Sequence, residues 1–358
     1  MMTRTPPPGH LVCPIDRIAQ KLARERRFGQ AEQDAFCGPC AVAVKVVVAR
    51  TLPAAGLDRL TERFDVEVGG LPFDRDWLYE HAPGANAIVA DPTVPVHDDL
   101  LDRAGASLQV VSNFAVGFDN IDTAAVRERG LRATNTPNVL TNATAELAVA
   151  LMQAAGRRIV ETDQIFRRGD WVGWEPEQFL GRELSGATVG LVGFGRIGQR
   201  VAELLAGFGS KLVFTDAHPM DEAAAKHGAQ RLGLDELLAV ADYVSLHVNL
   251  TPETAHMMNA ATLAKCKPGS ILVNTCRGGV VDTAALVEAL RNGPLAAAGL
   301  DVYENEPAVP EDLVALPNTV LVPHVGSATR RTRNAMATLC ADNVIAVLGG
   351  EEPPTPVV

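Results

Sequence analysis

The sequence lacks an apolar run long enough to cross a bilayer, so we expect no membrane partner. Residues 1–9 carry a proline triplet and no apolar signal core, so secretion is not indicated. The six cysteines are too few and too dispersed for a disulfide framework of the kind that stabilises small secreted proteins. A reducing, cytoplasmic location fits this composition best.

Positive charge is also scarce: 32 Lys and Arg residues stand against 43 Asp and Glu residues, a formal net charge of −11. An acidic chain repels phosphate backbones, so nucleic acid is not an expected partner. A local arginine or a helix N-terminus can still bind a small anion, because short-range contacts outweigh the distant field. The 358 residues, of which 47% are hydrophobic, favour two domains, each with its own core.

Residues 1–43 form an N-terminal appendage that we expect to be disordered. Cys37-Gly38-Pro39-Cys40 resembles a thioredoxin active site but lacks the preceding strand that such a motif needs. No second pair of metal-ligating residues lies nearby in the sequence, so we expect no metal site at these cysteines. The basic run Lys21–Arg27 fits a solvated helix face better than a nucleic-acid patch. Val44-Lys45 could be the true start of the protein.

From residue 44 onward, short apolar runs alternate with amphipathic stretches, which is the pattern of a parallel α/β sheet. The first part of this region predicts strands at Lys45–Ala49, Asp65–Val68, Ala87–Ala90 and Leu108–Ser112. A long helical pattern follows over Ala143–Val160, where we place a boundary between domains. The Trp- and Gly-rich segment Gly169–Gly181 indicates an ordered loop.

A second α/β unit starts at Thr188, and the chain closes with a helical pattern over Arg330–Leu348. The strands predicted for this unit are Thr188–Val192, Lys211–Thr215, Tyr243–Val248, Ile271–Asn274, Ala297–Leu300 and Val320–Val322. Because crossovers between parallel strands are right-handed, this unit should form a doubly wound sheet. The predicted fold is α/β with two doubly wound parallel-sheet domains, one from residues 44–141 plus 325–358 and the other from residues 142–324.

The strongest local signal is a glycine-rich turn, Gly193-Phe194-Gly195-Arg196-Ile197-Gly198. It directly follows the strand Val189–Val192 and opens a helix, which is the context that a dinucleotide-binding turn requires. Gly193 permits the tight turn, Gly195 lets the backbone approach a pyrophosphate, and Gly198 allows the helix to pack close to the sheet. The phosphates would then meet the free N–H groups of the helix N-terminus.

Asp216 ends the next strand, 18 residues after Gly198, near the spacing expected for a ribose-binding acid. Its carboxylate would accept hydrogen bonds from the ribose hydroxyls and repel a 2′-phosphate, so the sequence favours NAD over NADP. The plainer alternatives are a strand-end turn with structural glycines and an aspartate that caps the following segment.

Three polar residues follow strands of the second unit. Arg277 follows Ile271–Asn274, Glu306 follows Ala297–Leu300, and His324 ends Val320–Val322. Because the carboxyl ends of parallel strands meet at one edge, we expect these groups to face one cleft. The arginine fork matches a carboxylate and a keto oxygen, the histidine can exchange a proton near neutral pH, and the glutamate can fix its tautomer. Taken alone, an arginine or a glutamate in a loop is more often a solvated charge, and a histidine at a strand end is more often a structural or surface residue.

This constellation suits hydride transfer between a nicotinamide and the C2 of a small 2-keto or 2-hydroxy acid. The same residues resemble the D-isomer-specific 2-hydroxyacid dehydrogenases, and within that family the glyoxylate/hydroxypyruvate reductases. The resemblance covers roughly residues 44–358 and rests on Gly193–Gly198, Asn274–Asp282, Asp301–Pro307, Pro323–Thr329, Ser112–Asn120 and Ala328–Asn334.

The resemblance implies a flavodoxin-like substrate domain, a Rossmann NAD domain, NAD as cofactor and a homodimer formed through the nucleotide domain. It implies that Arg277 binds substrate and that Glu306 and His324 handle the proton. It also implies that the backbone N–H groups of Val116 and Gly117 meet the substrate carboxylate. The residues that it places around NAD, besides the three glycines of the turn, are Arg196, Ile197, Asp216, Val248, Thr275, Cys276, Asp301 and Gly326.

One departure and two alternatives bear on the substrate. Asp91 stands where related sequences usually carry neutral or apolar residues, which predicts that bulky anionic substrates are disfavoured. The chain could instead be a phosphoglycerate or phosphite dehydrogenase, although phosphite enzymes typically place a lysine at the position of Val116. It could also be a binding protein that senses NAD on the same scaffold, since fold alone does not decide function.

Overall fold

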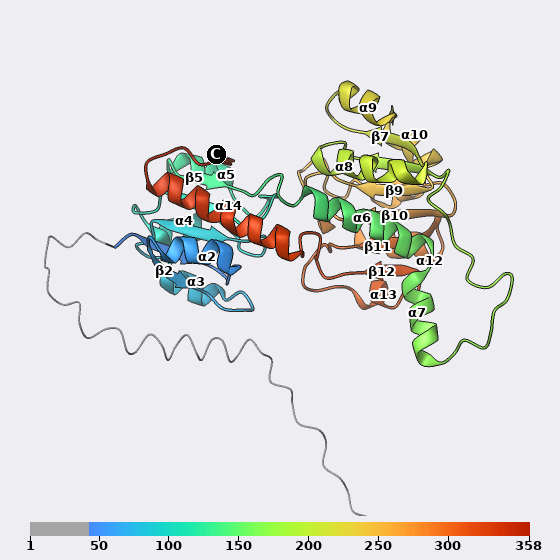
Figure 1. The fold of residues 1–358 in the computed structure, drawn as a ribbon, viewed down its shortest axis with the longest axis horizontal. Helices are drawn as coiled ribbons and strands as arrows, with labels where there is room; N and C mark the ends of the chain where they lie inside the picture. The colour runs from blue at the N-terminus through green and yellow to red at the C-terminus, as the bar shows by residue number, and fades with distance from the viewer. Residues whose placement is uncertain (1–42) are drawn as a thin grey trace, which may run out of the picture. The chain divides into compact units, whose positions relative to one another are not determined.

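Two parallel β-sheets organise the part of the protein that the computed structural model describes, residues 43–358 (Figure 1). Val44–Val358 form one compact unit. The predictions for the N-terminal appendage, for Cys37-Gly38-Pro39-Cys40 and for Lys21–Arg27 lie outside the described residues. The predicted fold class, two doubly wound parallel-sheet α/β domains, is confirmed.

The first sheet has five strands in the flavodoxin-like order β2-β1-β3-β4-β5, and all of its neighbours are parallel. The strands are β1 (Lys45–Val48), β2 (Asp65–Val68), β3 (Ala87–Ala90), β4 (Val110–Asn113) and β5 (Arg132–Thr134). The intervening helices are α2 (Ala54–Thr61), α3 (Arg75–His81), α4 (Asp98–Ala104) and α5 (Thr123–Glu128). The four predicted strands are present within two residues of their expected ends, whereas the short edge strand β5 was not predicted.

The second sheet has seven strands in the order β12-β11-β10-β9-β6-β7-β8, again all parallel. The strands are β6 (Thr188–Val192), β7 (Lys211–Thr215), β8 (Gln230–Arg231), β9 (Tyr243–Leu246), β10 (Ser270–Asn274), β11 (Leu295–Leu300) and β12 (Thr319–Leu321). All six predicted strands are found, and only the two-residue β8 is additional. The strand order reverses between β6 and β9, and open α/β sheets bind ligands beyond the carboxyl ends of the strands at such a point.

Helices cover both faces of the second sheet, and α6 and α8 pack against each other on one of them. The helices that connect its strands are α8 (Arg196–Leu205), η1 (Ala206–Phe208), α9 (Asp221–His227), α10 (Leu234–Val240), α11 (Ala260–Leu263), η2 (Gly278–Val280), α12 (Thr283–Arg291) and α13 (Glu311–Val314). The segment Gly169–Gly181 contains no helix or strand, as predicted.

The single helix predicted over Ala143–Val160 is wrong, because the chain forms two helices, α6 (Thr141–Gly156) and α7 (Ile159–Arg168). The break occurs because the carbonyl oxygen of Gly156 accepts a hydrogen bond from the N–H of Arg182 at 2.7 Å rather than from the next helical turn. Arg158 then takes a left-handed conformation with φ of 54°. A side chain at Gly156 would overlap the hydroxyl of Tyr243, so the close approach needs glycine.

The C-terminal helix α14 (Arg330–Leu348) belongs spatially with the first sheet. Figure 1 shows α14 lying against this sheet beside α2. The two helices approach closely at Gly56, where a Cβ atom would overlap the backbone of Ala337. After α14 the chain returns to the sheet edge, where the N–H of Val357 donates to the carbonyl of Ala133 in β5 at 2.7 Å. The domain limits predicted from the sequence, residues 44–141 plus 325–358 for one domain and residues 142–324 for the other, stay a prediction.

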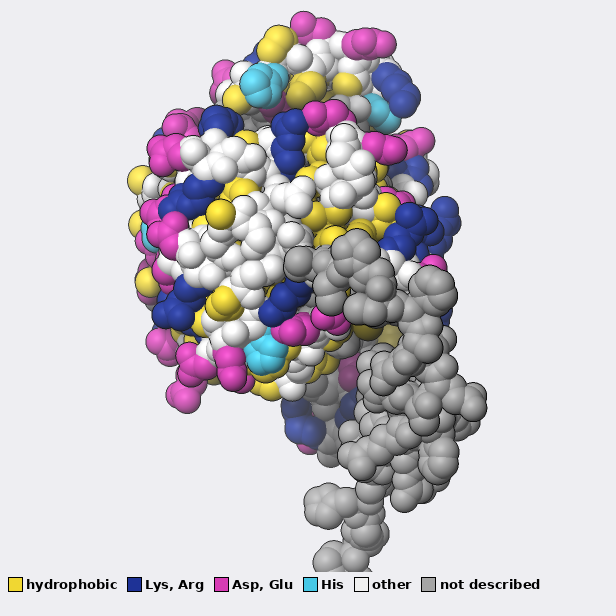
Figure 2. Space-filling view, turned by 90° about the vertical axis from the view of Figure 1, so that its left-hand side faces the viewer, with side chains coloured by type: hydrophobic (Ala, Val, Ile, Leu, Met, Phe, Trp, Pro, Cys, Tyr) yellow, Lys and Arg dark blue, Asp and Glu magenta, His cyan; other side chains and the backbone are white. Residues whose placement is uncertain are grey.

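The surface of the described residues carries charges of both signs. Figure 2 shows Lys and Arg side chains interspersed with Asp and Glu side chains on the face that it draws. No helix within residues 43–358 combines the length and the apolar character that a membrane span requires. Over the same range, no group of three or more His, Cys, Asp or Glu side chains is placed to hold a metal ion.

A charged cluster fastens the amino-terminal edge of the second sheet. The carboxylate of Asp242, at the start of β9, accepts hydrogen bonds from Lys267 Nζ at 2.8 Å and from the N–H of Thr188 at 2.9 Å, and it pairs with Arg182. Burial raises the pKa of Asp242, but these donors and their positive charges outweigh it and hold the pKa below the ordinary range. Asp242 therefore stays ionised and ties together the starts of neighbouring strands.

We predict that Asp242→Asn lowers the free energy of unfolding by about 2 kcal/mol at neutral pH, because three partly buried donors lose a buried, charged acceptor. The pKa of Asp242 is lower in the folded state than in the unfolded state, so the carboxylate stabilises the fold at pH values above the ordinary pKa of a carboxyl group. This stabilisation is lost as the pH falls through the folded-state pKa. The deficit of the variant should therefore shrink below about pH 4. Urea unfolding across pH measures it.

Asp235→Asn is the matched control, since Asp235 forms an exposed ion pair with Lys265 and should change stability by about 0.5 kcal/mol or less. An Asp242→Asn deficit no larger than that of the control, or one that grows in acid, would contradict the role assigned to Asp242.

Candidate active site

The glycine-rich turn has the backbone that a dinucleotide needs. Gly193 follows β6 with φ of +92°, and a Cβ atom there would run into the carbonyl of His247. A Cβ atom at Gly195, by contrast, would project into open space, so the backbone is exposed to an approaching ligand. Gly195 is also the N-cap of α8, whose first N–H groups lack intrahelical acceptors. The turn therefore fits a pyrophosphate.

Asp216 lies directly beside this turn, at the end of β7. One carboxylate oxygen accepts the N–H of Phe194 at 2.7 Å, and the other accepts the N–H of His218 at 2.9 Å. Each oxygen keeps a further lone pair for a ribose hydroxyl. Arg231 donates to the backbone carbonyl of Asp216 at 2.9 Å, so a cation stands close to the same position.

Several buried polar atoms near the turn have no partner within the described residues. They are both ring nitrogens of His247, which follows β9, and the hydroxyl of Thr275, which follows β10. Burial lowers the pKa of His247 to about 4, so its ring is neutral at pH 7. Buried polar atoms without partners are rare unless a ligand or water meets them. These atoms therefore fit the polar edge of a bound dinucleotide.

A cavity of about 710 Å³ lies beyond the carboxyl ends of the strands and is lined by loops of both sheets. It brings together eleven of the residues selected from the sequence: Val116, Gly117, Ile197, Val248, Thr275, Cys276, Arg277, Asp301, Glu306, His324 and Gly326. Gly193, Gly195, Arg196, Gly198 and Asp216 are not part of its lining and lie at the glycine-rich turn.

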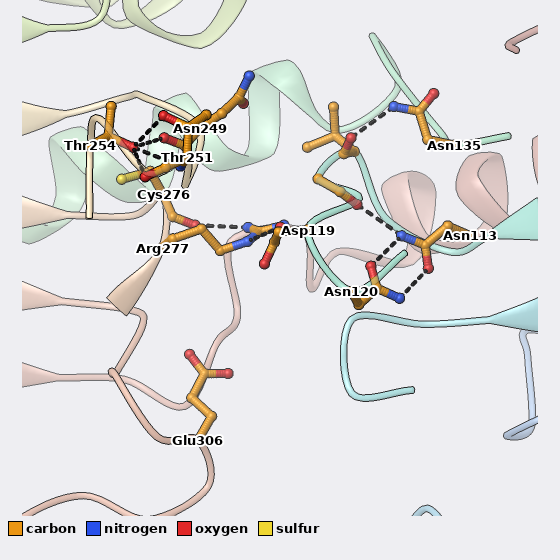
Figure 3. Close-up of polar contacts among 12 residues, drawn as sticks. Asn113, Asp119, Asn120, Asn135, Asn249, Thr251, Thr254, Cys276, Arg277 and Glu306 are labelled. Carbon is orange, nitrogen blue, oxygen red and sulfur yellow. Dashed lines mark hydrogen bonds and ion pairs between the residues drawn. The ribbon is translucent and has the colours of Figure 1, made fainter. Parts of the chain in front are cut away.

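Arg277 reaches from the second sheet to a loop of the first (Figure 3). Its Nε donates to Asp119 at 2.8 Å and its Nη1 donates to the carbonyl of Cys276 at 2.8 Å. Its Nη2 lies against Gly117, where any side chain would overlap the guanidinium. The plane of the guanidinium is thus fixed before a ligand arrives, with 19% of the side chain exposed. Asp119 was not among the site residues predicted from the sequence.

The loop that follows β4 presents free backbone donors to the cavity. The side-chain amide of Asn113 donates to the carbonyl of Gly117 at 2.8 Å, and that of Asn135 donates to the carbonyl of Val116 at 2.7 Å. In the described part of the chain, the N–H groups of Val116 and Gly117 donate no hydrogen bond. Figure 3 shows Asn113 paired with Asn120, which steadies the same loop. An anion at this loop would find two open donors.

Glu306 and His324 form a hydrogen-bonded pair at the cavity wall. A Glu306 oxygen lies 2.7 Å from His324 Nδ1, and the other oxygen accepts the N–H of Tyr303 at 2.9 Å. Burial raises the pKa of Glu306, yet the hydrogen bond and charge of His324 outweigh it and hold the pKa below the usual range. Glu306 is therefore an anion at neutral pH, and the Nε2 of His324 is left for another partner.

His324 owes its position to a strained turn. It has a left-handed backbone with φ of +52°, unusual for a residue with a side chain. Asp301 holds this turn: its carbonyl accepts the N–H of His324 at 2.9 Å, and its carboxylate accepts those of Val325 at 2.6 Å and Gly326 at 2.8 Å. Burial raises the pKa of Asp301. Asp301 therefore supports the turn that carries His324. It also lines the cavity, on the side where the resemblance placed it near NAD.

Cys276 is a packing residue next to Arg277. Burial raises the pKa of its thiol to about 11, and its sulfur lies 3.1 Å from an amide oxygen of Asn274. A thiol with a raised pKa is neutral at pH 7 and is therefore a poor nucleophile. Cys276 is partly buried and lines the cavity, so the expectation that it packs against the cofactor stays a prediction.

The chain is similar to one family over most of the described residues. The model of the D-isomer specific 2-hydroxyacid dehydrogenase NAD-binding domain matches residues 149–326. The glyoxylate reductase of Thermococcus litoralis is 45% identical to this chain, over 87% of this chain and 95% of its own length. The glyoxylate reductase of Pyrococcus furiosus is 44% identical to this chain, over 87% of this chain and 94% of its own length.

Solved structures show the same similarity. The TT0316 protein of Thermus thermophilus has a TM-score of 0.83 and 47% identity, covering 88% of this chain and all of that one. An NADPH-dependent glyoxylate/hydroxypyruvate reductase from Sinorhizobium meliloti, solved with NADP and malonate, has a TM-score of 0.77 and 35% identity over 88% of this chain and 97% of that one.

Proposed function

The chain belongs to the D-isomer-specific 2-hydroxyacid dehydrogenases, and we propose that it reduces a small 2-keto acid such as glyoxylate or hydroxypyruvate with NADH. The observation that carries this proposal is the cavity in which Arg277, the Glu306–His324 pair and the open N–H groups of Val116 and Gly117 meet. Together they offer an anion site, a fixed cation and a proton donor, which are the groups that keto-acid reduction requires.

Substrate binding uses the fixed donors. The N–H groups of Val116 and Gly117 would bind the carboxylate, and the guanidinium of Arg277 would bridge the carboxylate and the keto oxygen. Because Asp119 already orients the guanidinium, little conformational freedom is lost on binding. The same positive charge stabilises the negative charge that develops on the keto oxygen during reduction.

Proton transfer uses the Glu306–His324 pair. Glu306 would hold the Nδ1 proton of His324 and stabilise the imidazolium, so that Nε2 donates its proton to the keto oxygen. NADH, when bound at the glycine-rich turn, supplies the hydride to C2. The unpartnered Thr275 hydroxyl and His247 ring would orient the dinucleotide.

A panel of 2-keto acids assayed for NADH consumption tests the proposal. Turnover of glyoxylate or hydroxypyruvate is the expected result. Tight NADH binding without turnover of any keto acid would overturn it in favour of a binding protein that senses the dinucleotide. Oxidation of phosphite or 3-phosphoglycerate alone would favour the other family members considered above.

Substitutions of Arg277 and His324 should affect different constants. We predict that Arg277→Ala raises KM for the keto acid strongly, because the substrate loses its cation. We predict that His324→Ala lowers kcat by about 100-fold or more, because the keto oxygen loses its proton donor. Steady-state kinetics with circular dichroism as a folding check measures both. Near-wild-type kinetics in either variant would contradict the assigned role.

Cofactor choice should depend on Asp216. We predict that Asp216→Ala raises the ratio of kcat/KM for NADPH to that for NADH by about tenfold, because the repulsion of a 2′-phosphate is lost and Arg231 stands nearby. Asp221→Ala, an exposed change in α9, is the control and should leave the ratio unaltered. An unchanged ratio in Asp216→Ala would show that another group selects the cofactor.

We also propose a cytoplasmic homodimer that associates through the nucleotide-binding domain. A run of exposed apolar side chains around α7 and the loop after it supports such an interface, since patches of this kind mark contact surfaces. Phe166 is 66% exposed, Trp174 is 80% exposed and Leu180 is 66% exposed. The buried free thiols of Cys266 and Cys340 are compatible with a reducing compartment.

Light scattering after gel filtration tests the dimer. We predict a wild-type mass of twice the chain mass and a monomer for Trp174→Glu, because a charge would be buried in the interface. Val314→Glu changes an equally apolar, exposed residue in α13 and should remain dimeric. A monomeric wild type, or a dimeric Trp174→Glu, would rule out this surface.

A further inference from the structure

An ion pair lines the cavity on the side of the first sheet. Arg50 follows β1 and Asp91 follows the neighbouring strand β3, so both side chains reach the cavity from the carboxyl ends of their strands. Arg50 Nη1 lies 3.2 Å from Asp91 Oδ2, and the two side chains are 27% and 16% exposed. Asp91 Oδ1 accepts the N–H of Thr93 at 2.8 Å and its hydroxyl at 2.6 Å. The orientation of the carboxylate is therefore fixed before a ligand binds.

This pair has hydrogen-bonding capacity that residues 43–358 do not use. Asp91 Oδ2 faces Arg50 and keeps a free lone pair. Arg50 Nη1 donates to the Thr93 hydroxyl at 3.1 Å, whereas its Nε is shut off from solvent and has no partner. The pair thus offers both an acceptor and a donor. A hydroxyl group, which donates one hydrogen bond and accepts others, can satisfy both.

The charges at this wall balance. Arg333, in the first turn of α14, also lines the cavity, and burial lowers its pKa while the carboxylates of Asp91 and Asp301 counteract that shift. Two arginines therefore stand with two aspartates, and no net charge is left to attract a second anionic group. The expectation from the sequence that Asp91 disfavours bulky anionic substrates is consistent with this balance and stays a prediction.

The wall borders the free side of the proposed substrate. In the proposed binding mode the carboxylate meets the loop after β4, and the keto oxygen meets Arg277 and His324 of the second sheet. The remaining substituent of C2 is then left with the wall of the first sheet. Asp91 lies beside the carboxylate loop, because β3 pairs with β4 and the carbonyl of Asp91 accepts the side-chain amide of Asn120 at 3.0 Å.

We propose that Asp91, held by Arg50 and Thr93, is a specificity-determining residue that recognises a hydroxyl group on C3 of the 2-keto acid. The inference rests on the proposed function and makes 3-hydroxy-2-keto acids, of which hydroxypyruvate is the simplest, the preferred substrate class. The hydroxyl would donate to Asp91 Oδ2 and accept from Arg50. A methyl group in its place would displace water from the wall without replacing its hydrogen bonds. Glyoxylate has no C3, so it leaves this water in place and remains a substrate.

Hydroxypyruvate and pyruvate differ by this hydroxyl alone and test the inference. We predict that wild-type kcat/KM favours hydroxypyruvate by about tenfold or more, the effect of one hydrogen bond to a charged group. Asp91→Asn should lower this preference by a similar factor. Thr93 would hold the amide oxygen, so the amide nitrogen, which accepts no hydrogen bond, would take the place of Oδ2. Steady-state NADH consumption with circular dichroism as a folding check measures both.

Two further variants sharpen the test. Asp91→Leu removes both carboxylate oxygens and should abolish the preference for hydroxypyruvate over pyruvate, because the wall then offers no acceptor. Asp102→Asn is the matched control: Asp102 pairs with Arg129 at 2.7 Å, is 67% exposed and lies outside the cavity lining. This control should leave the preference unchanged.

The outcomes separate the two proposals. A preference for hydroxypyruvate that survives in both Asp91 variants overturns the role of Asp91 and leaves the proposed function standing. An equal loss of kcat/KM for hydroxypyruvate, pyruvate and glyoxylate also overturns it, because Asp91 would then only support the carboxylate loop. Failure of every keto acid to turn over in the wild type, with NADH still bound, would instead count against the proposed function.

Discussion

The site depends on the ion pair between Arg277 and Asp119. Arg277 follows β10 in the second sheet and Asp119 lies in the loop after β4 in the first, so the pair joins the two halves of the cavity. Gly117 lacks the side chain that would displace the guanidinium. With its Nε and Nη1 committed to protein acceptors, the arginine can present only its remaining donors to a ligand. The geometry of the cation is therefore set by the fold rather than by the substrate.

Most of the fold was predictable because most of the strands are buried on both faces. Such strands consist of continuous runs of apolar residues, which are visible in the sequence. The errors fall where a distant contact decides the local structure. The edge strand β5 has three residues and gains its partners only from β4 and the C-terminal residues. The interruption between α6 and α7 depends on a backbone hydrogen bond from Arg182, and the helical pattern gives no sign of it.

The candidate site was predictable to the extent that its residues follow strands. Arg277, Glu306 and His324 line one cavity because parallel strands deliver their carboxyl ends to one edge. Asn113 and Asn135 were missed, since asparagines in loops are ordinary turn residues until the structure shows which carbonyls they hold. No local pattern marks them, because each acts on a residue four to nineteen positions away.

The return of the C-terminus to β5 has a practical consequence. The last residues supply backbone bonds to Ala133 and pack Val357 and Val358 against the core of the first sheet, while Thr355 bonds to the buried Asn343 of α14. They thus shield a sheet edge that could otherwise recruit a strand from another molecule. Deletion of residues 355–358 would remove a structural element rather than a loose segment, and aggregation during purification is the expected result.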